Sequence, residues 1–267
     1  MTVSFGDLTP LEEATRVGFF TDTSVCIGCK ACEVACKEWN RIPEDGLRLT
    51  GMSYDNSVRL GADTWRHVAF IEQRRPDNGE LRWLMSSDVC MHCTEAACLD
   101  VCPTGSLFRT EFGTVVVQEN VCNGCGYCIP ACPFGVIGQR PDDGRAWKCT
   151  LCYDRLSVGA TPACVKACPT ESIRFGPLEE MRERAHDRLA ELQRQGVEDA
   201  RLYGHDRADG IGGAGSVFLL LDEPEVYGLP PDPVVATRDL GGTWRAVGVA
   251  ALSLVALAAS TLLGKRP

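Results

Sequence analysis

Sixteen cysteines dominate this chain of 267 residues, and they fall into four groups of four. Groups one and three have the spacing C-x2-C-x2-C-x3-C, group two has C-x2-C-x4-C-x3-C, and group four has C-x2-C-x11-C-x3-C. In chain order the groups are Cys26, Cys29, Cys32 and Cys36; Cys90, Cys93, Cys98 and Cys102; Cys122, Cys125, Cys128 and Cys132; and Cys149, Cys152, Cys164 and Cys168. Cysteines in such numbers serve disulfide bonding, zinc binding or iron–sulfur ligation.

The spacing favours iron–sulfur clusters over both alternatives. A 4Fe–4S cubane has four irons that each take one external thiolate, so a short C-x2-C-x2-C loop can bind three of them. Zinc sites usually pair two C-x2-C units and rarely place three thiolates so close together. Disulfide-rich domains are typically secreted behind a signal peptide. Residues 1–16 contain no apolar stretch and include the acids Asp7, Glu12 and Glu13, so we expect no signal peptide here.

The order of the groups predicts which cysteines share a cluster. In a two-cluster ferredoxin motif, the fourth cysteine of each group binds the other cluster. Groups two and three are neighbours and can complete one such unit, which leaves groups one and four to pair around it. We therefore predict four ligand tetrads. Tetrad one is Cys26, Cys29, Cys32 and Cys168; tetrad two is Cys36, Cys149, Cys152 and Cys164; tetrad three is Cys90, Cys93, Cys98 and Cys132; tetrad four is Cys102, Cys122, Cys125 and Cys128.

This pairing predicts an α+β fold built from two interleaved units of the bacterial-ferredoxin type, with small antiparallel hairpins and short helices. The first unit would contain residues 1–86 and 141–200, with residues 1–20 as its lead-in. The second unit, residues 87–140, would be inserted into the first. Residues 201–243 would form an extension and connector, and residues 244–267 a transmembrane anchor.

Local patterns predict the elements that must position the cysteines. β-prone runs at residues 67–73 and 81–86 flank the pair Asn78-Gly79, which favours a tight hairpin, and residues 106–118 predict a second hairpin. Apolar residues at helical spacing from Leu178 to Leu192 predict an amphipathic helix that ends near Gly196. The remaining expectations are helices over 10–16 and 31–39, strands over 172–175 and 217–221, and a loop over 153–163.

Residues 246–264 form a long uncharged stretch that contains only Ser253, Ser260 and Thr261 as polar interruptions. As a helix it would span about 28 Å, enough to cross the hydrocarbon core of a bilayer, so we predict a single-pass membrane anchor. Charge leaves its orientation open, because two basic residues lie on each side of the stretch. These residues are Arg238 and Arg245 before it, and Lys265 and Arg266 after it.

Other residue types predict little chemistry of their own. The net charge of −9 argues against a nucleic-acid partner. We find no nucleophile–base pair, carboxylate pair or phosphate loop, so we expect no catalytic site in this chain. We interpret His92 as a loop residue, and we interpret four lysines beside cysteines as solvated, with tuning of a cluster's potential as the alternative. These lysines are Lys30, Lys37, Lys148 and Lys166, and the isolated histidines are His67, His186 and His205.

The order and spacing of the four groups resemble the electron-transfer subunits of the molybdopterin oxidoreductase superfamily, most closely the β subunit of membrane-bound formate dehydrogenases. The segments that carry the resemblance are CIGCKACEVACKEWN, CMHCTEAACLDVCPTGSL, CNGCGYCIPACPFGV and WKCTLCYDRLSVGATPACVKACPT, followed by YGLPPDP and one hydrophobic helix. The likeness extends from about Phe20 to the end of the chain. Cys125 keeps group three complete, whereas nitrate-reductase-type relatives have tryptophan there.

The resemblance implies a molybdenum or tungsten catalytic subunit as partner, with electrons arriving at tetrad one and leaving from tetrad three to a membrane cytochrome b and then quinone. It also implies that the helix ends in the cytoplasm and that the clusters lie on the periplasmic face. A cytoplasmic face is the alternative, because the chain ends three residues after its hydrophobic stretch. Two other functions stay open: the same role in a hydrogenase or sulfur-compound reductase, and a zinc scaffold that docks proteins.

Overall fold

The structure, a computed structural model, describes residues 16–46, 49–75 and 79–263. These residues divide into one compact unit that extends to Val235 and a second that begins at Ala236. The helix predicted over residues 10–16, apart from its last residue, and Asn78 of the predicted turn lie outside the described residues.

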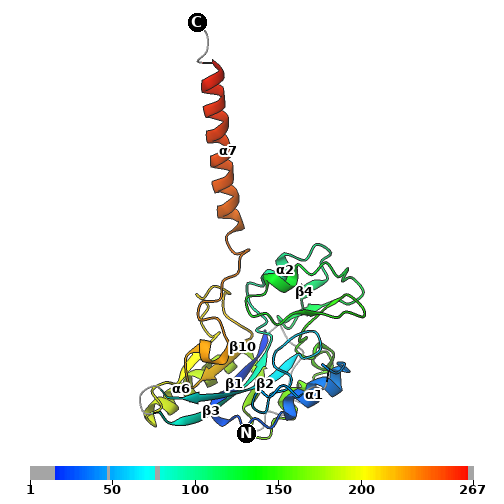
Figure 1. The fold of residues 1–267 in the computed structure, drawn as a ribbon, viewed down its shortest axis with the longest axis vertical. Helices are drawn as coiled ribbons and strands as arrows, with labels where there is room; N and C mark the ends of the chain where they lie inside the picture. Colours follow the sequence, from blue (N-terminus) through cyan, green and yellow to red (C-terminus); the bar gives the residue numbers. More distant parts are fainter. Residues whose placement is uncertain (1–15, 47–48, 76–78, 264–267) are drawn as a thin grey trace. The chain divides into compact units, whose positions relative to one another are not determined.

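The first unit is a mixed α/β structure of short elements (Figure 1). Its strands are β1 (Val17–Asp22), β2 (Arg66–Arg74), β3 (Leu81–Val89), β4 (Leu107–Arg109), β5 (Val115–Val117), β6 (Gly138–Gln139), β7 (Ala146–Trp147), β8 (Ile173–Pro177), β9 (Arg201–Tyr203) and β10 (Ser216–Leu220). Its helices are α1 (Ala31–Asn40), α2 (Ala97–Asp100), α3 (Cys128–Ala131), α4 (Tyr153–Leu156), α5 (Ala163–Lys166) and α6 (Leu178–Arg194), and its 3-10 turns are η2 (Thr23–Val25) and η3 (Pro224–Tyr227).

A four-stranded sheet in the order β8-β1-β10-β9 joins segments that are far apart in the sequence. β1 pairs in parallel with β10, with Phe19 opposite Ser216, and antiparallel with β8. β9 closes the other edge by antiparallel pairing with β10. We expected residues 1–20 to be a lead-in and residues 201–243 to be an extension. The structure instead places strands from both segments in the same sheet.

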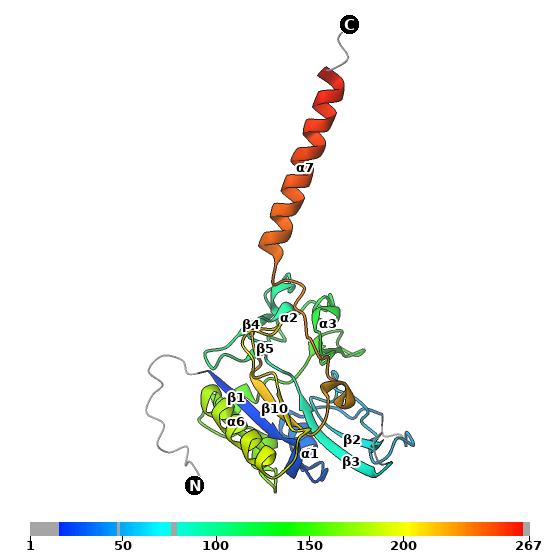
Figure 2. The same ribbon diagram turned by 90° about the vertical axis from the view of Figure 1, so that its left-hand side faces the viewer.

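α6 covers one face of this sheet, as Figure 2 shows. Successive strand residues point to opposite faces, so Phe20 and Leu219 pack against α6, whereas Phe19 and Phe218 pack into the core that contains the cysteines. The helix contacts the sheet through the stripe that its sequence predicts: Leu178, Met181, Ala185, Leu189 and Leu192. Burial of a large aliphatic side chain contributes roughly 1.5–3 kcal/mol, so this stripe fixes α6 on the sheet.

The predicted hairpins are present. β2 and β3 pair antiparallel from Arg66 opposite Val89 to Arg74 opposite Leu81, and β4 pairs with β5. A third hairpin, β6 with β7, was not predicted. The segment expected as a loop over residues 153–163 instead begins with the helix α4 and ends at the start of α5.

Two helix pairs connect the cysteine groups. α1, which carries the end of group one, contacts α5, which carries Cys164 of group four. α2, in group two, contacts α3, in group three. These are the groups that the cysteine spacing pairs. The division into units of residues 1–86 with 141–200 and of residues 87–140 stays a prediction.

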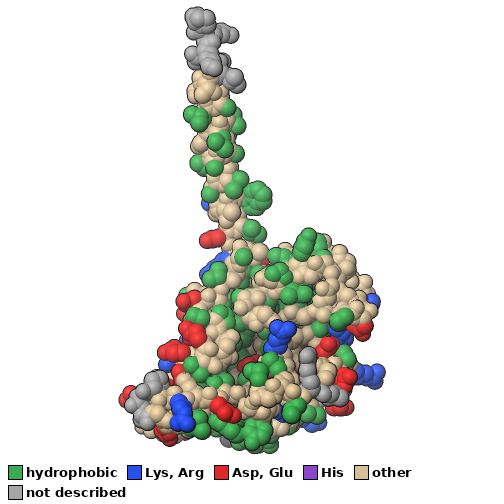
Figure 3. Space-filling model, in the orientation of Figure 1, with side chains coloured by type: hydrophobic (Ala, Val, Ile, Leu, Met, Phe, Trp, Pro, Cys, Tyr) green, Lys and Arg blue, Asp and Glu red, His purple; other side chains and the backbone are tan. Residues whose placement is uncertain are grey.

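The second unit contains α7 (Leu240–Leu263), whose side chains from Leu240 to Thr261 are exposed and mostly hydrophobic (Figure 3). Its segment Leu240–Thr261, with a mean hydropathy of 1.5, is long and apolar enough to cross a membrane. The polar residues within it satisfy their hydroxyl groups inside the helix. Ser253 Oγ donates to the carbonyl oxygen of Val249 at 2.9 Å, and Ser260 Oγ donates to that of Leu257 at 2.7 Å. Such internal bonds lower the cost of a hydroxyl group in an apolar environment.

Candidate metal centres

Two cavities in the first unit are each lined by one complete tetrad. The first contains all four cysteines of tetrad one, together with Lys30, Val68 and Ser87. The second contains all four cysteines of tetrad three, together with Met91, His92 and Lys148. Each cavity joins two cysteine groups, because Cys168 completes the first set and Cys132 the second.

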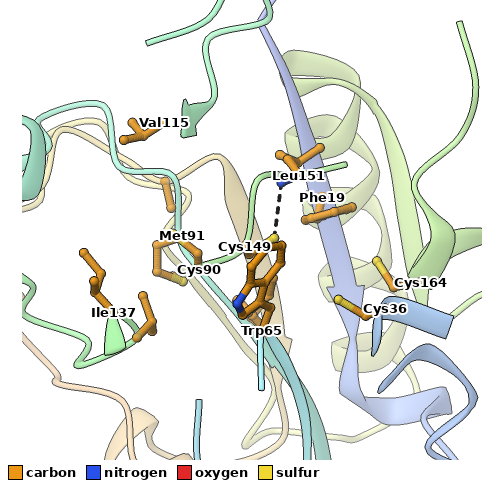
Figure 4. Packing of buried hydrophobic residues seen from close by; sticks show 14 of the residues in the cluster. Phe19, Cys36, Trp65, Cys90, Met91, Val115, Ile137, Cys149, Leu151 and Cys164 are labelled. Carbon is orange, nitrogen blue, oxygen red and sulfur yellow. Dashed lines mark hydrogen bonds between the residues drawn. The ribbon is translucent and has the colours of Figure 1, made fainter. Parts of the chain in front are cut away.

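Tetrads two and four are recognised by the charge interactions among their thiols. The strongest ones on Cys36 come from the other members of tetrad two: Cys149, Cys164 and Cys152. Those on Cys128 come from the other members of tetrad four: Cys122, Cys102 and Cys125. In Figure 4, Cys149 lies between Cys90 on one side and Cys36 and Cys164 on the other. The structure thus gathers the cysteines as their spacing predicts; their binding of clusters stays a prediction.

The cysteine loops turn through residues with a left-handed backbone. Gly28 has a φ of 64°, and a β-carbon at this position would lie 2.6 Å from the ring of Phe70. Gly124 has a φ of 74°, and a β-carbon there would lie 2.4 Å from the carbonyl oxygen of Gly144. Only glycine meets both requirements, since it has no β-carbon and adopts positive φ readily. These glycines let two neighbouring cysteines turn toward the same side of a loop.

Several thiols of the tetrads are poor thiolates by themselves, because their pKa values are raised. Burial raises the pKa of Cys149 to about 12 and that of Cys32 to about 11. Burial raises the pKa of Cys36 well above its usual value, and repulsion by Cys149 and Cys164 adds to this effect. A bound metal cation reverses such shifts, because coordination deprotonates a thiol outright. A donor set of clustered, buried thiols therefore fits a polynuclear iron centre.

Within the described ranges, no three Cys, His, Asp or Glu side chains converge on the position of a single metal ion. A cubane does not require such convergence, because each of its four irons takes one thiolate. Backbone amides donate to several sulfurs instead: Leu151 N–H donates to Cys149 Sγ at 3.3 Å (Figure 4), and Ala146 N–H donates to Cys122 Sγ at 3.4 Å. Hydrogen bonds to cysteine sulfur are a recognised influence on cluster potentials.

His92 lies in a loop, as predicted, and is almost fully buried beside tetrad three. Its Nδ1 accepts a hydrogen bond from the Val115 N–H at 3.1 Å, so in the neutral ring the proton is on Nε2. Burial, and then the charges of Lys148 and Arg16, hold the pKa of His92 well below its usual value. Nε2 has no partner among the residues that the structure describes. This buried donor fits a site that receives a sulfur-rich acceptor.

Two buried cations beside the tetrads were not predicted. Lys148, which we interpreted as solvated, has a side chain that is 1% exposed, so that interpretation is wrong. Burial alone would lower its pKa, but the thiols of Cys90 and Cys98 outweigh burial and raise it. Arg66 is also 1% exposed, and no local sequence signal marks it. Both cations lie against cysteines rather than in water.

Two other lysines, Lys30 and Lys37, and three other histidines have partners of their own. Lys30 Nζ pairs with Glu33 at 3.0 Å and with Asp55 at 3.4 Å. His67 was interpreted as isolated, but its Nε2 lies 2.7 Å from Asp55 Oδ2 and its Nδ1 lies 3.7 Å from Asp88 Oδ2. His67 therefore connects the segment around Asp55 to the β2–β3 hairpin. The rings of His186 and His205 also contact one another, with centroids 5.2 Å apart.

Comparison with known proteins agrees with this description. Residues 25–106 and residues 81–178 each match a sequence profile of a 4Fe-4S dicluster domain. The chain is 45% identical over 263 residues to the formate dehydrogenase iron–sulfur subunit of Haemophilus influenzae, covering 94% of this chain and 81% of the relative. It is 46% identical over 226 residues to the nitrate-inducible formate dehydrogenase iron–sulfur subunit of Escherichia coli, which covers 83% of this chain and 75% of the relative.

A more distant relative belongs to the anaerobic dimethyl sulfoxide reductase of Escherichia coli and is 37% identical over 182 residues, which cover 66% of this chain and 80% of the relative. The two dicluster matches and the sixteen cysteines fit four 4Fe–4S clusters. The formate dehydrogenase relatives are iron–sulfur subunits, not catalytic ones. The chain belongs to the family of formate dehydrogenase iron–sulfur subunits.

Proposed function

We propose that this chain holds one 4Fe–4S cluster on each of its four tetrads and conducts electrons from a molybdenum or tungsten catalytic subunit that oxidises formate. The electrons would pass to a membrane cytochrome b and then to quinone. The observation that carries the proposal is that two cavities are each lined by four cysteines from two distant groups. Bound clusters would supply one-electron carriers at these positions.

The chain's own residues support a direction for this path. In tetrad one, Cys29 is exposed and Cys32 is buried, so this tetrad reaches from the surface into the core. That position suits the arrival of electrons from a partner. The cavity of tetrad three is lined by Val235, the last residue before the second unit. That position suits departure toward a membrane partner.

Tetrads one, two and three are also neighbours inside the first unit. Ser87 Oγ lies 3.2 Å from Cys32 Sγ of tetrad one, and it accepts a hydrogen bond from Arg66, which also donates to Cys164 of tetrad two. Cys149 of tetrad two interacts electrostatically with Cys90 of tetrad three. These contacts support a continuous path from tetrad one through tetrad two to tetrad three. The helix pairs α1–α5 and α2–α3 are consistent with two interleaved ferredoxin-like units.

We assign α7 as a single-pass membrane anchor, with the cluster-bearing unit on the periplasmic face. The length and apolar character of Leu240–Thr261 support the anchor. The sidedness rests on the resemblance to membrane-bound formate dehydrogenases alone. Protease treatment of intact spheroplasts tests it, because a periplasmic unit is digested and a cytoplasmic one is protected.

Paired cysteine substitutions test the ligand assignment. Cys168→Ser and Cys29→Ser should alter the same cluster signal in low-temperature electron paramagnetic resonance (EPR), because both belong to tetrad one. Cys164→Ser, which changes a neighbouring cysteine of group four, should alter a different signal, the one that Cys36→Ser alters. If Cys164→Ser and Cys168→Ser alter one common signal, the crosswise pairing is wrong.

A second candidate function is the same relay in a sulfur-compound reductase, and the dimethyl sulfoxide reductase relative favours it. Identification of the co-purifying large subunit separates the two. Reduction of the clusters by formate, detected by EPR in the complex as isolated, supports the formate dehydrogenase assignment. Oxidation of pre-reduced clusters by a sulfoxide would support the reductase if formate does not reduce the clusters.

A further inference from the structure

Arg66 lies at the meeting point of tetrads one and two. It begins β2, and its guanidinium reaches α5, where Nη2 donates to Cys164 Sγ at 3.3 Å. Nη1 donates to the carbonyl oxygen of Ser87 at 3.0 Å and contacts Ser87 Oγ at 3.3 Å. The ring of Phe19 covers the guanidinium, with its centroid 4.9 Å from Cζ. Arg66 is therefore enclosed by β1, β3 and α5.

The charge of Arg66 is balanced by cysteines. The strongest attractions on its guanidinium come from Cys164 and Cys149 of tetrad two and from Cys32 of tetrad one. Its Nε is buried without a partner among the described residues. A buried cation without counter-charge is strongly unfavourable, so the negative charge that Arg66 needs must come from the tetrads.

Lys148 occupies the equivalent position between tetrads two and three. It follows β7, and its ammonium donates to the carbonyl oxygens of Val115 and Cys149, the latter at 2.9 Å. Its Nζ also lies 3.7 Å from Cys90 Sγ. The strongest attractions on it come from Cys90 and Cys98 of tetrad three and from Cys149 of tetrad two. Lys148 is therefore balanced by thiolates as well.

A cubane with four thiolates is negatively charged, and reduction adds one more negative charge. A fixed cation beside the ligands stabilises the reduced form more than the oxidised form, which raises the reduction potential. Two unit charges within about 4 Å, at the effective dielectric of a protein interior, change an equilibrium by well over tenfold. The added electron is spread over the whole cluster, so we take tenfold as a lower limit.

We propose that Arg66 and Lys148 set the reduction potentials of the clusters they join, Arg66 those of tetrads one and two, and Lys148 those of tetrads two and three. This inference rests on the proposed function, because it requires clusters on these tetrads. Tetrad two receives both cations, so its cluster is the one whose potential they raise most. None of the strongest attractions on either cation involves tetrad four.

Redox titration of the purified complex, followed by EPR, tests this proposal. Arg66→Met should lower the midpoint potentials of the clusters on tetrads one and two by at least about 59 mV. For one electron, this shift is a tenfold change in the reduction equilibrium constant. Lys148→Met should do the same for tetrads two and three. The signal of tetrad four should stay unchanged in both variants and serves as the internal control.

The conservative variants Arg66→Lys and Lys148→Arg separate charge from packing. They keep the cation, so they should shift the potentials by less than half as much as the methionine variants. Equal shifts in the conservative and neutral variants, or unchanged potentials in the neutral variants, would overturn the proposal. If a methionine variant loses clusters, Arg66→Gln or Lys148→Gln replaces it and is judged by the same limits. If the glutamine variant also loses clusters, the conservative variant decides, and a shift of tenfold or more there overturns the proposal.

The wild-type complex separates this inference from the proposed function. Four cluster signals in the wild type with no shift in the variants contradict only the role of the two cations. A wild-type complex without cluster signals contradicts the proposed function itself.

Discussion

Substitution of Gly124 by alanine tests quantitatively how the loop of group three is held. Gly124 lies between Cys122 and Cys125, and its missing β-carbon makes room for the carbonyl oxygen of Gly144 in the turn between β6 and β7. The side chain of Gln139 connects the same two segments, since its Nε2 donates to the carbonyl oxygens of Gly124 at 2.8 Å and Gly144 at 2.6 Å. Alanine would force these segments apart.

Gly126, in the same loop, is the matched control. Its φ of 75° is nearly that of Gly124, but the nearest atom to a β-carbon there is 3.8 Å away. Alanine in the left-handed conformation costs about 1–2 kcal/mol at either position. Overpacking against a backbone adds about 1–3 kcal/mol at Gly124 only. The difference between Gly124→Ala and Gly126→Ala should therefore be about 1–3 kcal/mol, or roughly 5- to 150-fold in an equilibrium constant.

The rate of iron release to a ferrous chelator measures this difference. If iron leaves through local opening of the loop, the rate follows the population of the open form. Gly124→Ala should then lose the cluster of tetrad four roughly 5- to 150-fold faster than Gly126→Ala, while the other three signals persist. Equal rates in the two variants would refute the packing of this loop against the β6–β7 turn.

Two other parts of the chain give predictions of their own, His67 and α7. Burial alone would lower the pKa of His67, but Asp88 and Asp55 outweigh burial and raise it. The stabilisation is therefore complete below the pKa of the unfolded chain and is lost as pH rises through the higher folded pKa. His67→Gln should lower the free energy of unfolding by about 1–3 kcal/mol at pH 6, seen as a lower melting temperature, and by much less at pH 9. A loss of stability that is the same at both pH values would contradict this. In α7, Leu252→Arg should raise the free energy of membrane insertion by about 2.5–3.5 kcal/mol and release the chain into alkaline carbonate extracts. The control Thr243→Arg, near the helix start, should leave the chain in the membrane fraction.

Elements with local signals were predicted well. The β2–β3 and β4–β5 hairpins and the apolar stripe of α6 follow from patterns within short segments, and the structure contains all three. β1 was missed because its strand character depends on pairing with β10 and β8, which lie far along the chain. Residues 17–22 carry no turn signal or alternating pattern strong enough to indicate a strand by themselves.

The cysteine grouping could be predicted because spacing alone limits which thiols can share a cluster. The burial of the two cations beside the tetrads could not be predicted in this way. Arginine and lysine are usually exposed, so a single sequence favours solvation for Lys148 and gives no reason to single out Arg66. Their burial depends on β3, β5 and α5 closing around them, which is a property of the tertiary structure. The partners of His67 were missed for the same reason, since Asp55 and Asp88 approach it from separate segments.

Iron and acid-labile sulfide analysis of the purified chain in its complex, combined with Mössbauer spectroscopy, tests the central claim most directly. Four cubanes on the sixteen cysteines require at least about sixteen irons and sixteen sulfides per copy of this chain, four of each per cluster, in the spectral form of 4Fe–4S centres. Stoichiometric zinc, or iron far below this level in protein isolated without oxygen, would contradict the account.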